Sequence, residues 1–549
     1  MNYQEMRVKP ARTEWSGGEE ANLKSLAQTA IRNPTLSLCM IVKNEEEFLP
    51  RCLNSVKDYV DEMIIVDTGS TDRTVEIAKG FGAKVFIHPW EGNFSKARNY
   101  SLKYATCDWI LILDADCEVD GEDVHKLKEV IKDNDVNYIF SPVYDIYQGS
   151  KNLGIYDSGL LFRNHLGFHY SGTVHNELKY SGAIKKVNIK VYDYGSHLSD
   201  EQMQEKFLRT TTLLKEQLKT NPYNPVTHRY LGVSYMGVKM YDEAIAESKI
   251  ALELLDESKY DMRNFMVSYY IICAAHFERG DLKEAEKYAL WAIEIDDLFI
   301  DIFCVLSFVY YNTKRYDRFL QYSERYLTLW NGAGRSNSTL NHFGYHTIGH
   351  KWKIHLLRGF YYLSSSQDEM GNIEIDTALE ESAGIEECLK LLGNFYLENN
   401  WLDKAEEVFR KLTHSHAVCG NEYAIDAMIK IGQINFKKGD LKEAVNFWKK
   451  AVDAEPTLFD IRLLVCRINI VQGNLEDVIT ECNQLLQMLD MSRNITLESL
   501  TDMSNLFNLI GERLKDKQEL QAAETSFKIF KDLKQISQQE FNIKIQTET

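Results

Sequence analysis

The stretch Trp109-Ile-Leu-Ile-Leu-Asp114-Ala-Asp116 is an apolar strand that ends in two carboxylates one residue apart. In an extended chain, residues two apart point to the same side, so Asp114 and Asp116 can reach one cation or one polyphosphate. A hard divalent ion such as Mg2+ or Mn2+ prefers such oxygen ligands and keeps positions open for phosphate oxygens. Because Asp-x-Asp is also common in solvated loops, the neighbouring sequence has to decide between a site and a loop.

Two earlier strands end in polar clusters of the same kind. Residues 36–42 are apolar and run into Asn44 and Glu45, and residues 63–66 run into the segment 67–72. A helical stretch follows each strand, which is the alternation typical of a parallel α/β sheet. In such sheets ligands lie beyond the carboxyl ends of the strands. We therefore expect the three polar clusters to meet in one crevice.

Four ordered blocks between roughly residues 35 and 200 resemble the signature of the inverting family 2 glycosyltransferases. These enzymes have the α/β GT-A fold, which is the Rossmann-like fold of nucleotide-diphospho-sugar transferases. The blocks are Val42-Lys-Asn-Glu45, Val66-Asp-Thr-Gly-Ser-Thr-Asp72, Phe94-Ser-Lys-Ala-Arg-Asn99 and Leu113-Asp-Ala-Asp116. Because helical repeats follow, the chain is similar to bacterial peptide and protein glycosyltransferases of the sublancin S-glycosyltransferase type. The resemblance implies a metal-dependent glycosyltransferase with Mg2+ or Mn2+ and a nucleotide-sugar donor, a UDP-sugar.

The same resemblance implies roles for individual residues. Asp67 matches the carboxylate that reads uracil, Arg98 the basic residue beside the nucleotide, and Asp116 the metal ligand. Asn44 and Glu45 match positions at the nucleoside, and Asp114 matches the position at the ribose and sugar. Val42 and Ala115 are the remaining nucleotide-binding positions. Two alternatives stay open. Asp67 and Asp72 are also ordinary turn and cap residues, a role that we assign to Asp72, and Arg98 could be a surface cation.

The acceptor side and the base are expected in the second half of this domain. Phe168-His-Tyr-Ser-Gly-Thr-Val-His-Asn-Glu-Leu178 resembles the family's Tyr-x-Gly-x-Val-His-Glu block, except that Asn176 separates His175 from Glu177. We expect Glu177 to be the base, with His175 as a metal or diphosphate ligand; Asp157 and His175 are the alternatives for the base. His197 is a second candidate metal or diphosphate ligand. The chain has no Gly-x-Ser-x-Gly motif, which favours one-step inversion over covalent catalysis.

From about residue 222 the sequence repeats. Small or apolar residues recur with steps of 12, 4 and 3, as at Gly232, Ala244, Ser248 and Ala251. The spacing recurs in six further units, which begin at Cys273, Ser307, Gly393, Gly432, Cys466 and Gly511. This is the tetratricopeptide pattern, and it predicts an all-α solenoid whose concave face suits an extended peptide. A purely architectural or dimerising array is the alternative.

One interval does not fit the repeat. Phe319 and Ala405 are too far apart for one repeat, and a loop-like stretch from Asn331 to Ser338 lies between them, followed by four histidines. The spacing of the histidines suggests zinc, but two glycines weaken a helix there and no cysteine or carboxylate completes the set nearby. We therefore expect an irregular insertion near residues 331–383.

Composition limits the possible functions. The 549 residues carry a net charge of -18, which argues against non-specific binding to nucleic acid or to an anionic membrane. No apolar run is long enough to span a bilayer, and no secretion signal is recognisable, so we expect a cytoplasmic protein. The expected domains are an N-terminal extension (1–33), the GT-A domain (34–200), a connecting helix (201–221) and the repeats (222–549).

Three functions remain open at this point. The first is transfer of a sugar to a peptide or protein acceptor held by the repeats, in a monomer or possibly a homodimer. The second is the same chemistry on a lipid-linked or polysaccharide acceptor. The third is a non-catalytic repeat scaffold whose nucleotide crevice acts as a sensor. The full set of carboxylates and the absence of a membrane feature favour the first.

Overall fold

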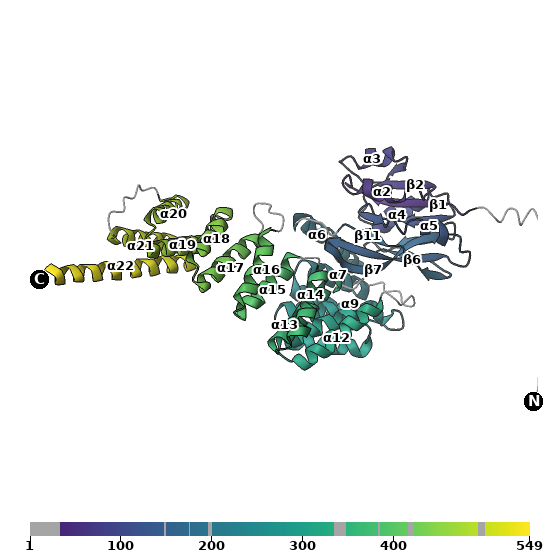
Figure 1. The fold of residues 1–549 in the computed structure, drawn as a ribbon. Helices are drawn as coiled ribbons and strands as arrows, with labels where there is room; N and C mark the ends of the chain where they lie inside the picture. The colour runs from purple at the N-terminus through teal and green to yellow at the C-terminus, as the bar shows by residue number, and fades with distance from the viewer. Residues whose placement is uncertain are drawn as a thin grey trace, which may run out of the picture. The chain divides into compact units, whose positions relative to one another are not determined.

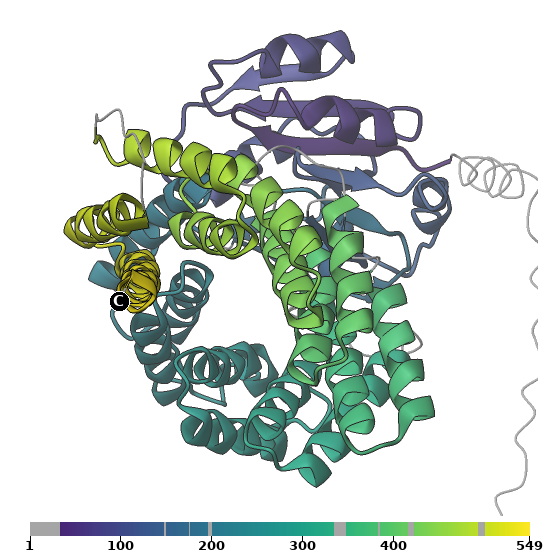
Figure 2. The ribbon, with the colours of Figure 1, turned by 60° about the vertical axis from the view of Figure 1, so that its left-hand side comes forward.

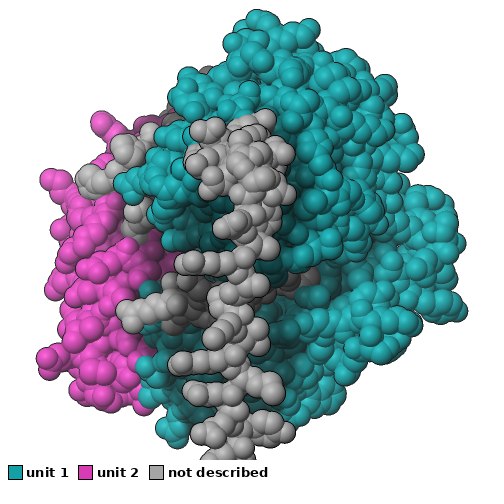
Figure 3. Space-filling model, turned by 90° about the vertical axis from the view of Figure 1, so that its right-hand side faces the viewer, with its two compact units in different colours: residues 1–351 teal, residues 352–549 magenta. Residues whose placement is uncertain are grey.

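A computed structural model describes residues 33–147, 150–174, 176–195, 200–333, 347–382, 385–414, 422–491 and 500–548. The chain divides into two compact units, residues 1–351 and 352–549, which Figure 3 colours separately. The first unit contains the sheet and the first helices of the array (Figure 1). The second unit contains helices from α13 onward.

The first unit is built on a nine-stranded mixed sheet. Eight of its strands follow the order β3-β2-β1-β4-β7-β6-β11-β5, and β10 pairs with β6. The strands are β1 (Leu36–Val42), β2 (Glu62–Asp67), β3 (Lys84–Ile87), β4 (Trp109–Ile112), β5 (Cys117–Val119), β6 (Tyr138–Tyr147), β7 (Ser150–Arg163), β10 (Ile184–Lys186) and β11 (Val191–Asp193).

The strand register brings the predicted polar clusters to one edge of the sheet. In the parallel pair of β1 and β2, Val42 lies opposite Asp67, so both strands end at the same level. β4 is parallel to β1 on its other side, with Ile112 opposite Cys39. The segment 113–116 therefore continues past the same edge. This α/β sheet, followed by an all-helical region, confirms the predicted fold class.

Helices cover both faces of the sheet because its strands are apolar on both sides. One core packs side chains of β1 and β4 against α2 (Leu49–Val56), α3 (Thr74–Gly80) and α5 (Lys126–Val130). The opposite core contains Cys39, Ile64 and Ile110 and is covered in part by α4 (Phe94–Leu102). The hairpin of β8 (His169–Ser171) and β9 (Glu177–Lys179) contributes Tyr170 and Leu178 to that second core.

The helical array starts within the first unit. The helices there are α6 (Asp200–Thr220), α7 (Pro225–Gly237), α8 (Tyr241–Glu253), η1 (Met262–Phe265), α9 (Met266–Glu278), α10 (Leu282–Ile295), α11 (Ile300–Asn312) and α12 (Tyr316–Ala333), with η2 (Ile348–His350) after them. Asn224 caps α7 by accepting hydrogen bonds from the backbone N–H groups of Val226 and Thr227, and Pro225 occupies its first turn. Consecutive helices pack in antiparallel pairs, as Figure 2 shows.

The second unit continues with paired helices. They are α13 (Lys351–Ser364), α14 (Asp368–Glu381), α15 (Glu386–Glu398), α16 (Leu402–His414), α17 (Glu422–Lys438), α18 (Leu441–Ala454), α19 (Phe459–Gln472), α20 (Leu475–Met488), α21 (Leu500–Asp516) and α22 (Leu520–Glu548). The repeat spacing has a direct structural cause here. A Cβ at Gly432 would overlap the indole of Trp448, sixteen positions on, so the first template position must be small where the third is large.

The expectation of an irregular insertion near residues 331–383 is wrong for most of that range. Residues 351–364 and 368–381 form the regular pair α13 and α14. Gly359, Gly371, Ile375 and Ala378 repeat the steps of 12, 4 and 3, and a Cβ at Gly359 would lie 2.7 Å from Ile375. In the other units a bulky residue precedes the second position by three, as Tyr241 and Leu441 do. Here that position is Asp368, which concealed the unit in the sequence.

One of the four histidines of this region, His355, has a clear structural role. His355 lies with Nδ1 2.6 Å from Glu374, which accepts a hydrogen bond from Arg358 Nε at 2.6 Å as well. This pairing of α13 with α14 needs no zinc. His342 and His346 lie outside the described residues.

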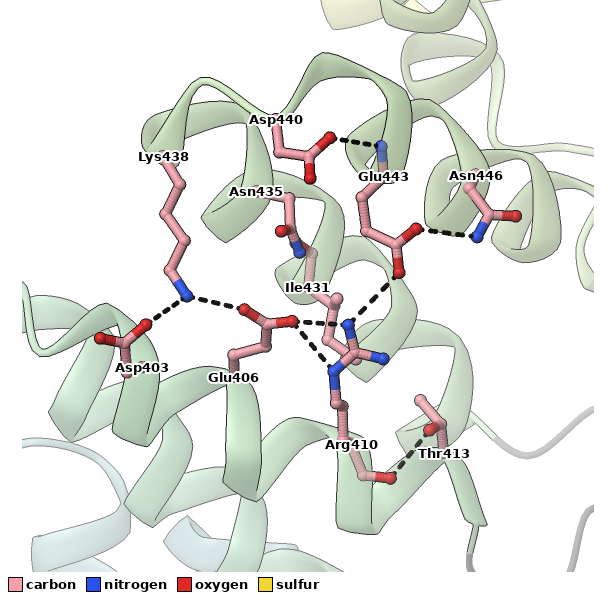
Figure 4. A network of polar contacts seen from close by, with 10 residues as sticks. All are labelled: Asp403, Glu406, Arg410, Thr413, Ile431, Asn435, Lys438, Asp440, Glu443 and Asn446. Atoms are coloured by element: carbon pink, nitrogen blue, oxygen red, sulfur yellow. Dashed lines mark hydrogen bonds and ion pairs between the residues drawn. The ribbon is translucent and has the colours of Figure 1, made fainter.

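A polar network links three consecutive helices of the second unit (Figure 4). Lys438 on α17 contacts Asp403 at 2.6 Å and Glu406 at 2.8 Å, both on α16. Arg410 on α16 contacts Glu406 at 2.6 Å and Glu443 on α18 at 3.3 Å. Burial raises the pKa of Glu406, but the hydrogen bonds from Lys438 and Arg410 outweigh it and lower that pKa. The network links α16 to both α17 and α18.

Among the described residues, no helix is both long and apolar enough to cross a membrane.

Candidate functional site

The loops after β1 and β2 hold each other at the edge of the sheet. Asn44 has the left-handed φ of 57°, and its side-chain oxygen accepts a hydrogen bond from the Thr71 backbone N–H at 2.8 Å. The Glu45 backbone N–H donates to Thr74 Oγ1 at 2.7 Å. Val42 is buried and contributes its carbonyl oxygen, which accepts from the Thr68 backbone N–H. The predicted nucleoside-binding positions therefore lie together.

Asp67 is 3% exposed and shapes its own loop. Its carboxylate accepts hydrogen bonds from the backbone N–H groups of Gly69 and Ser70 at 3.1–3.2 Å. Asp72 likewise accepts from the Glu46 and Thr74 backbone N–H groups. These bonds match the turn and cap role weighed for both residues, and the reading of uracil by Asp67 stays a prediction.

Arg98 and Asp114 form an ion pair at the centre of the edge. Arg98 Nη2 donates to the two carboxylate oxygens of Asp114 at 2.7 and 3.0 Å. The Arg98 side chain is only 14% exposed and lies 5.5 Å from the ring centre of Tyr170, whereas the Asp114 side chain is 51% exposed. Arg98 is therefore no surface cation. Its guanidinium orients a carboxylate that still faces the open crevice.

Asp116 belongs to a second cluster, whose other members the sequence did not reveal. Ligand atoms of Asp116, Cys117 and Asp193 all lie within 4.8 Å of one another. Asp193 ends β11, far away in sequence, and also accepts hydrogen bonds from the Tyr156 hydroxyl at 3.2 Å and the Gly195 backbone N–H at 2.8 Å. A Cβ at Gly195 would overlap the Asp116 carboxylate, so a larger residue at this position would displace the Asp116 side chain.

Several carboxylates lie close together at this edge of the sheet, and their pKa values are raised as a result. Burial, together with Asp193, Asp114 and Glu45, raises the pKa of Asp116 to about 7. Burial, Asp114 and Asp72 raise the pKa of Glu45 to about 7. Burial also raises the pKa of Asp193. A divalent cation would relieve this repulsion, and the oxygen donors of Asp116 and Asp193 fit Mg2+ or Mn2+.

A cavity of about 470 Å3 leads from this edge to the predicted base. Arg98 and Asp114 line one part of it, and Asn176 and Glu177 line another. Glu177 on β9 has a largely exposed side chain with Lys179 Nζ 3.2 Å away. Asp157 also lines the cavity but is buried in an ion pair with Lys186 at 2.7 Å, so it is the less available carboxylate.

The remaining predicted positions are placed as follows. Ala115 is buried between the two aspartates, so only its backbone is available to a nucleotide. His175 and His197 lie outside the described residues. Sequence reasoning missed Asp193 because a single carboxylate at the end of a short strand is common; its one signal was its closeness to Tyr194-Gly-Ser-His197.

The helical array contributes to the same cavity. Tyr230 on α7 and Asn264 on η1 are part of its lining. Val174, just before the predicted catalytic pair, packs in one apolar cluster with Leu214 of α6, Leu231 of α7 and Val267 of α9. The first repeat helices are thus part of the site.

Comparison with known proteins agrees with this architecture. Residues 37–186 match the family described as Glycosyl transferase family 2, and residues 425–458 match a tetratricopeptide repeat. The SPbeta prophage-derived glycosyltransferase SunS of Bacillus subtilis is 31% identical over 265 residues, which are 46% of this chain and 62% of SunS.

Two further relatives match over shorter stretches. An uncharacterized glycosyltransferase of Rickettsia typhi is 45% identical over 87 residues, 16% of this chain and 30% of that protein. A TPR repeat-containing protein of Synechococcus elongatus is 60% identical over 84 residues, 15% of this chain and 21% of that protein. The chain spans less than two thirds of the length of each relative named here. Residues 37–186 are therefore a glycosyltransferase family 2 domain, in a chain that also carries tetratricopeptide repeats and is similar to SunS.

Proposed function

We propose that this chain is an inverting glycosyltransferase, which moves a sugar from a UDP-sugar to a side chain of a peptide or protein. One observation carries the proposal: a single cavity joins the Arg98–Asp114 pair at the strand ends to Glu177. The membership of residues 37–186 in glycosyltransferase family 2 supports the reaction class.

The donor would occupy the strand-end side of the cavity. Asn44, Glu45 and Asp67 are the positions proposed for the nucleoside, and Asp114, oriented by Arg98, is proposed for the sugar. Asp116 and Asp193 would hold the Mg2+ or Mn2+ ion, with His175 and His197 as the other proposed ligands. When bound, the ion supplies positive charge that stabilises the departing diphosphate.

The acceptor would enter beside Glu177. A hydroxyl or thiol of the acceptor gives its proton to the Glu177 carboxylate and forms the new bond at the anomeric carbon, as the bond to the diphosphate breaks. The two bonds lie on opposite sides of that carbon, so the configuration inverts. The largely exposed Glu177 carboxylate is accessible to such an acceptor.

A polypeptide acceptor is favoured by the helical array. Solenoids of this kind offer extended surfaces for peptides, and here Tyr230 and Asn264 bring the array into the cavity itself. A lipid-linked or polysaccharide acceptor has no comparable feature among the described residues.

The direct test uses purified full-length protein and a panel of labelled UDP-sugars with a cell extract. We expect label to enter the protein fraction, and donor hydrolysis in the absence of extract to stop on chelation and return with Mg2+ or Mn2+. Label in the solvent-extracted lipid fraction would replace the polypeptide acceptor with a lipid. A protein that neither binds nor hydrolyses any UDP-sugar would overturn the proposed activity.

A further inference from the structure

Asn176 is the residue that interrupts the family's His-Glu pattern, and the structure gives it an unusual environment. It immediately precedes Glu177 and, like Glu177, lines the 470 Å3 cavity. Its side-chain Nδ2 is buried and has no hydrogen-bond partner among the described residues. A buried amide donor without a partner costs roughly 1–3 kcal/mol, so this group calls for a hydrogen-bond acceptor from outside the described residues.

Residues 172–174, which precede Asn176 in the chain, contact two different parts of the structure. On the sheet side, the Phe94 backbone N–H donates to the Thr173 carbonyl at 2.9 Å, and Ser95 Oγ donates to the Gly172 carbonyl at 2.5 Å. On the repeat side, Val174 is buried in the cluster of α6, α7 and α9. Residues 172–174, which precede Asn176, are therefore held against both the sheet domain and the repeats.

The repeat side of the cavity has a wall formed by Tyr230 and Asn264, and a buried arginine holds this wall in place. Arg229 on α7 is 2% exposed and donates through Nη1 to the Asn264 carbonyl at 2.7 Å. Its guanidinium also lies 4.5 Å from the ring centre of Tyr230 and 5.1 Å from that of Phe265. The two repeat residues that line the cavity are thus tied together through one buried cation.

The Asn176 amide lies next to the proposed base Glu177 and can donate a hydrogen bond to a carbonyl oxygen in the cavity. An extended polypeptide offers such an oxygen at every residue, so its backbone can satisfy Asn176 while one of its side chains reaches Glu177. A sugar hydroxyl of the donor could accept the same hydrogen bond, but the proposed function assigns the donor to the part of the cavity lined by Arg98 and Asp114.

We infer that Asn176 is an acceptor-positioning residue: its amide donates a hydrogen bond to a backbone carbonyl of the polypeptide acceptor. The acceptor then lies between β9 and the wall formed by Tyr230 of α7 and Asn264 of η1. The inference rests on the proposed function and names the acceptor contact within that same site. It also gives the first repeat a role in holding the acceptor at the point of reaction.

The experiment compares Asn176→Asp and Asn176→Ala with the wild-type protein. Asn176→Asp keeps the shape of the side chain and removes the donor, and Asn176→Ala removes the amide without adding charge. Asn188→Asp, at an exposed position of the same domain, is the matched control. The probes are UDP-glucose or UDP-N-acetylglucosamine and short synthetic peptides with a central Ser, Thr or Cys.

Both Asn176 variants should raise the KM for the peptide roughly 10-fold, the effect of losing one buried hydrogen bond, and leave the KM for the UDP-sugar unchanged. Tyr230→Ala should raise the peptide KM as well. Asn188→Asp should match the wild type. In the absence of ligand, Asn176→Ala should melt at a slightly higher temperature because it removes an unpaired buried donor.

Several outcomes overturn the inference. A rise in the KM for the UDP-sugar with an unchanged peptide KM would assign Asn176 to the donor. Unchanged kinetics in both variants, or a wild-type protein that hydrolyses UDP-sugar but transfers to none of the peptides, would remove the acceptor role. If the wild-type protein neither binds UDP nor hydrolyses the donor, the proposed function itself has failed.

Discussion

The proposed chemistry depends on two carboxylates in different places. Glu177 lines the cavity, and Asp116 lies beside it in the cluster with Asp193. Glu177 comes from the β8–β9 hairpin, and Asp116 from the segment after β4. The two can be altered separately, because one faces the acceptor side and the other lies against Asp193 and Gly195.

Replacing Glu177 with Gln should abolish transfer and keep donor binding. The amide has the shape of the carboxylate but cannot take a proton, so we expect kcat to fall by roughly 100-fold or more. The UDP-induced rise in melting temperature should stay as in the wild type. Glu122→Gln, at an exposed position of the same domain, is the control and should keep full activity. Normal turnover in Glu177→Gln would move the base to another residue.

The crowded carboxylates predict how stability depends on pH in the absence of metal. The pKa of about 7 for both Asp116 and Glu45 lies above the usual carboxyl range. The folded state therefore binds protons more tightly than the unfolded state, and stability should fall as pH rises from about 4.5 to about 7. Added Mg2+ or Mn2+ should raise the melting temperature at pH 8 and do so less at pH 5, where protons compete.

The matched variants for this prediction are Asp116→Asn and Asp58→Asn. Asp116→Asn removes one of the repelling charges, so at pH 8 without metal it should melt above the wild type and respond little to the cation. Asp58 is exposed and away from the cluster, and its variant should behave as the wild type. An equal cation response in all three proteins would refute metal binding at Asp116.

At the scale of elements, the helix pairs depend on close contacts between their glycines and large side chains. A Cβ at Gly432 of α17 would overlap the buried indole of Trp448 on α18. Gly432→Ala should therefore destabilise this pair by about 1–3 kcal/mol, as overpacking does. Hydrogen exchange of peptides from residues 422–454 would show the loss of protection locally.

Gly237→Ala is the matched control for this substitution. Gly237 is also helical, and a Cβ there meets no atom within 4 Å. The variant should be neutral or slightly more stable, since alanine favours a helix over glycine. Equal protection in Gly432→Ala and the wild type would show that the pair can rearrange around the added methyl group.

At the scale of the whole chain, the position of a truncation should decide whether the catalytic domain survives. The sequence alone places the end of that domain before residue 222, but Val174 is buried against α6, α7 and α9. A fragment of residues 1–221 would expose this cluster and lose Tyr230 from the cavity. A fragment of residues 1–351 keeps the first compact unit whole.

We expect the 1–351 fragment to fold and to show the UDP-induced rise in melting temperature, and the 1–221 fragment to aggregate or melt well below it. Circular dichroism and size-exclusion chromatography would compare their folded states. If the second unit also binds the acceptor, the longer fragment should transfer to short peptides better than to large proteins. A well-folded, UDP-binding 1–221 fragment would contradict the role given to the repeats.

The sequence by itself determined the features that local pattern encodes. Alternating strands and helices gave the α/β domain, and the polar residues after residues 42, 66 and 113 marked the edge where its strands end. The recurrence of small residues gave the tetratricopeptide array except for the pair around Gly359, where Asp368 replaces the bulky residue of the other units. The roles of the individual site residues remain predictions.

Only the tertiary structure decided which distant residues meet. Asp193 meets Asp116 because β11 pairs with β5, Arg98 pairs with Asp114, and Val174 packs into the first repeats. No local sequence pattern predicts these contacts, because each depends on how separate elements pack against one another. The unpaired amide of Asn176 is visible for the same reason: a missing partner can be recognised only once every neighbour within the described structure is in place.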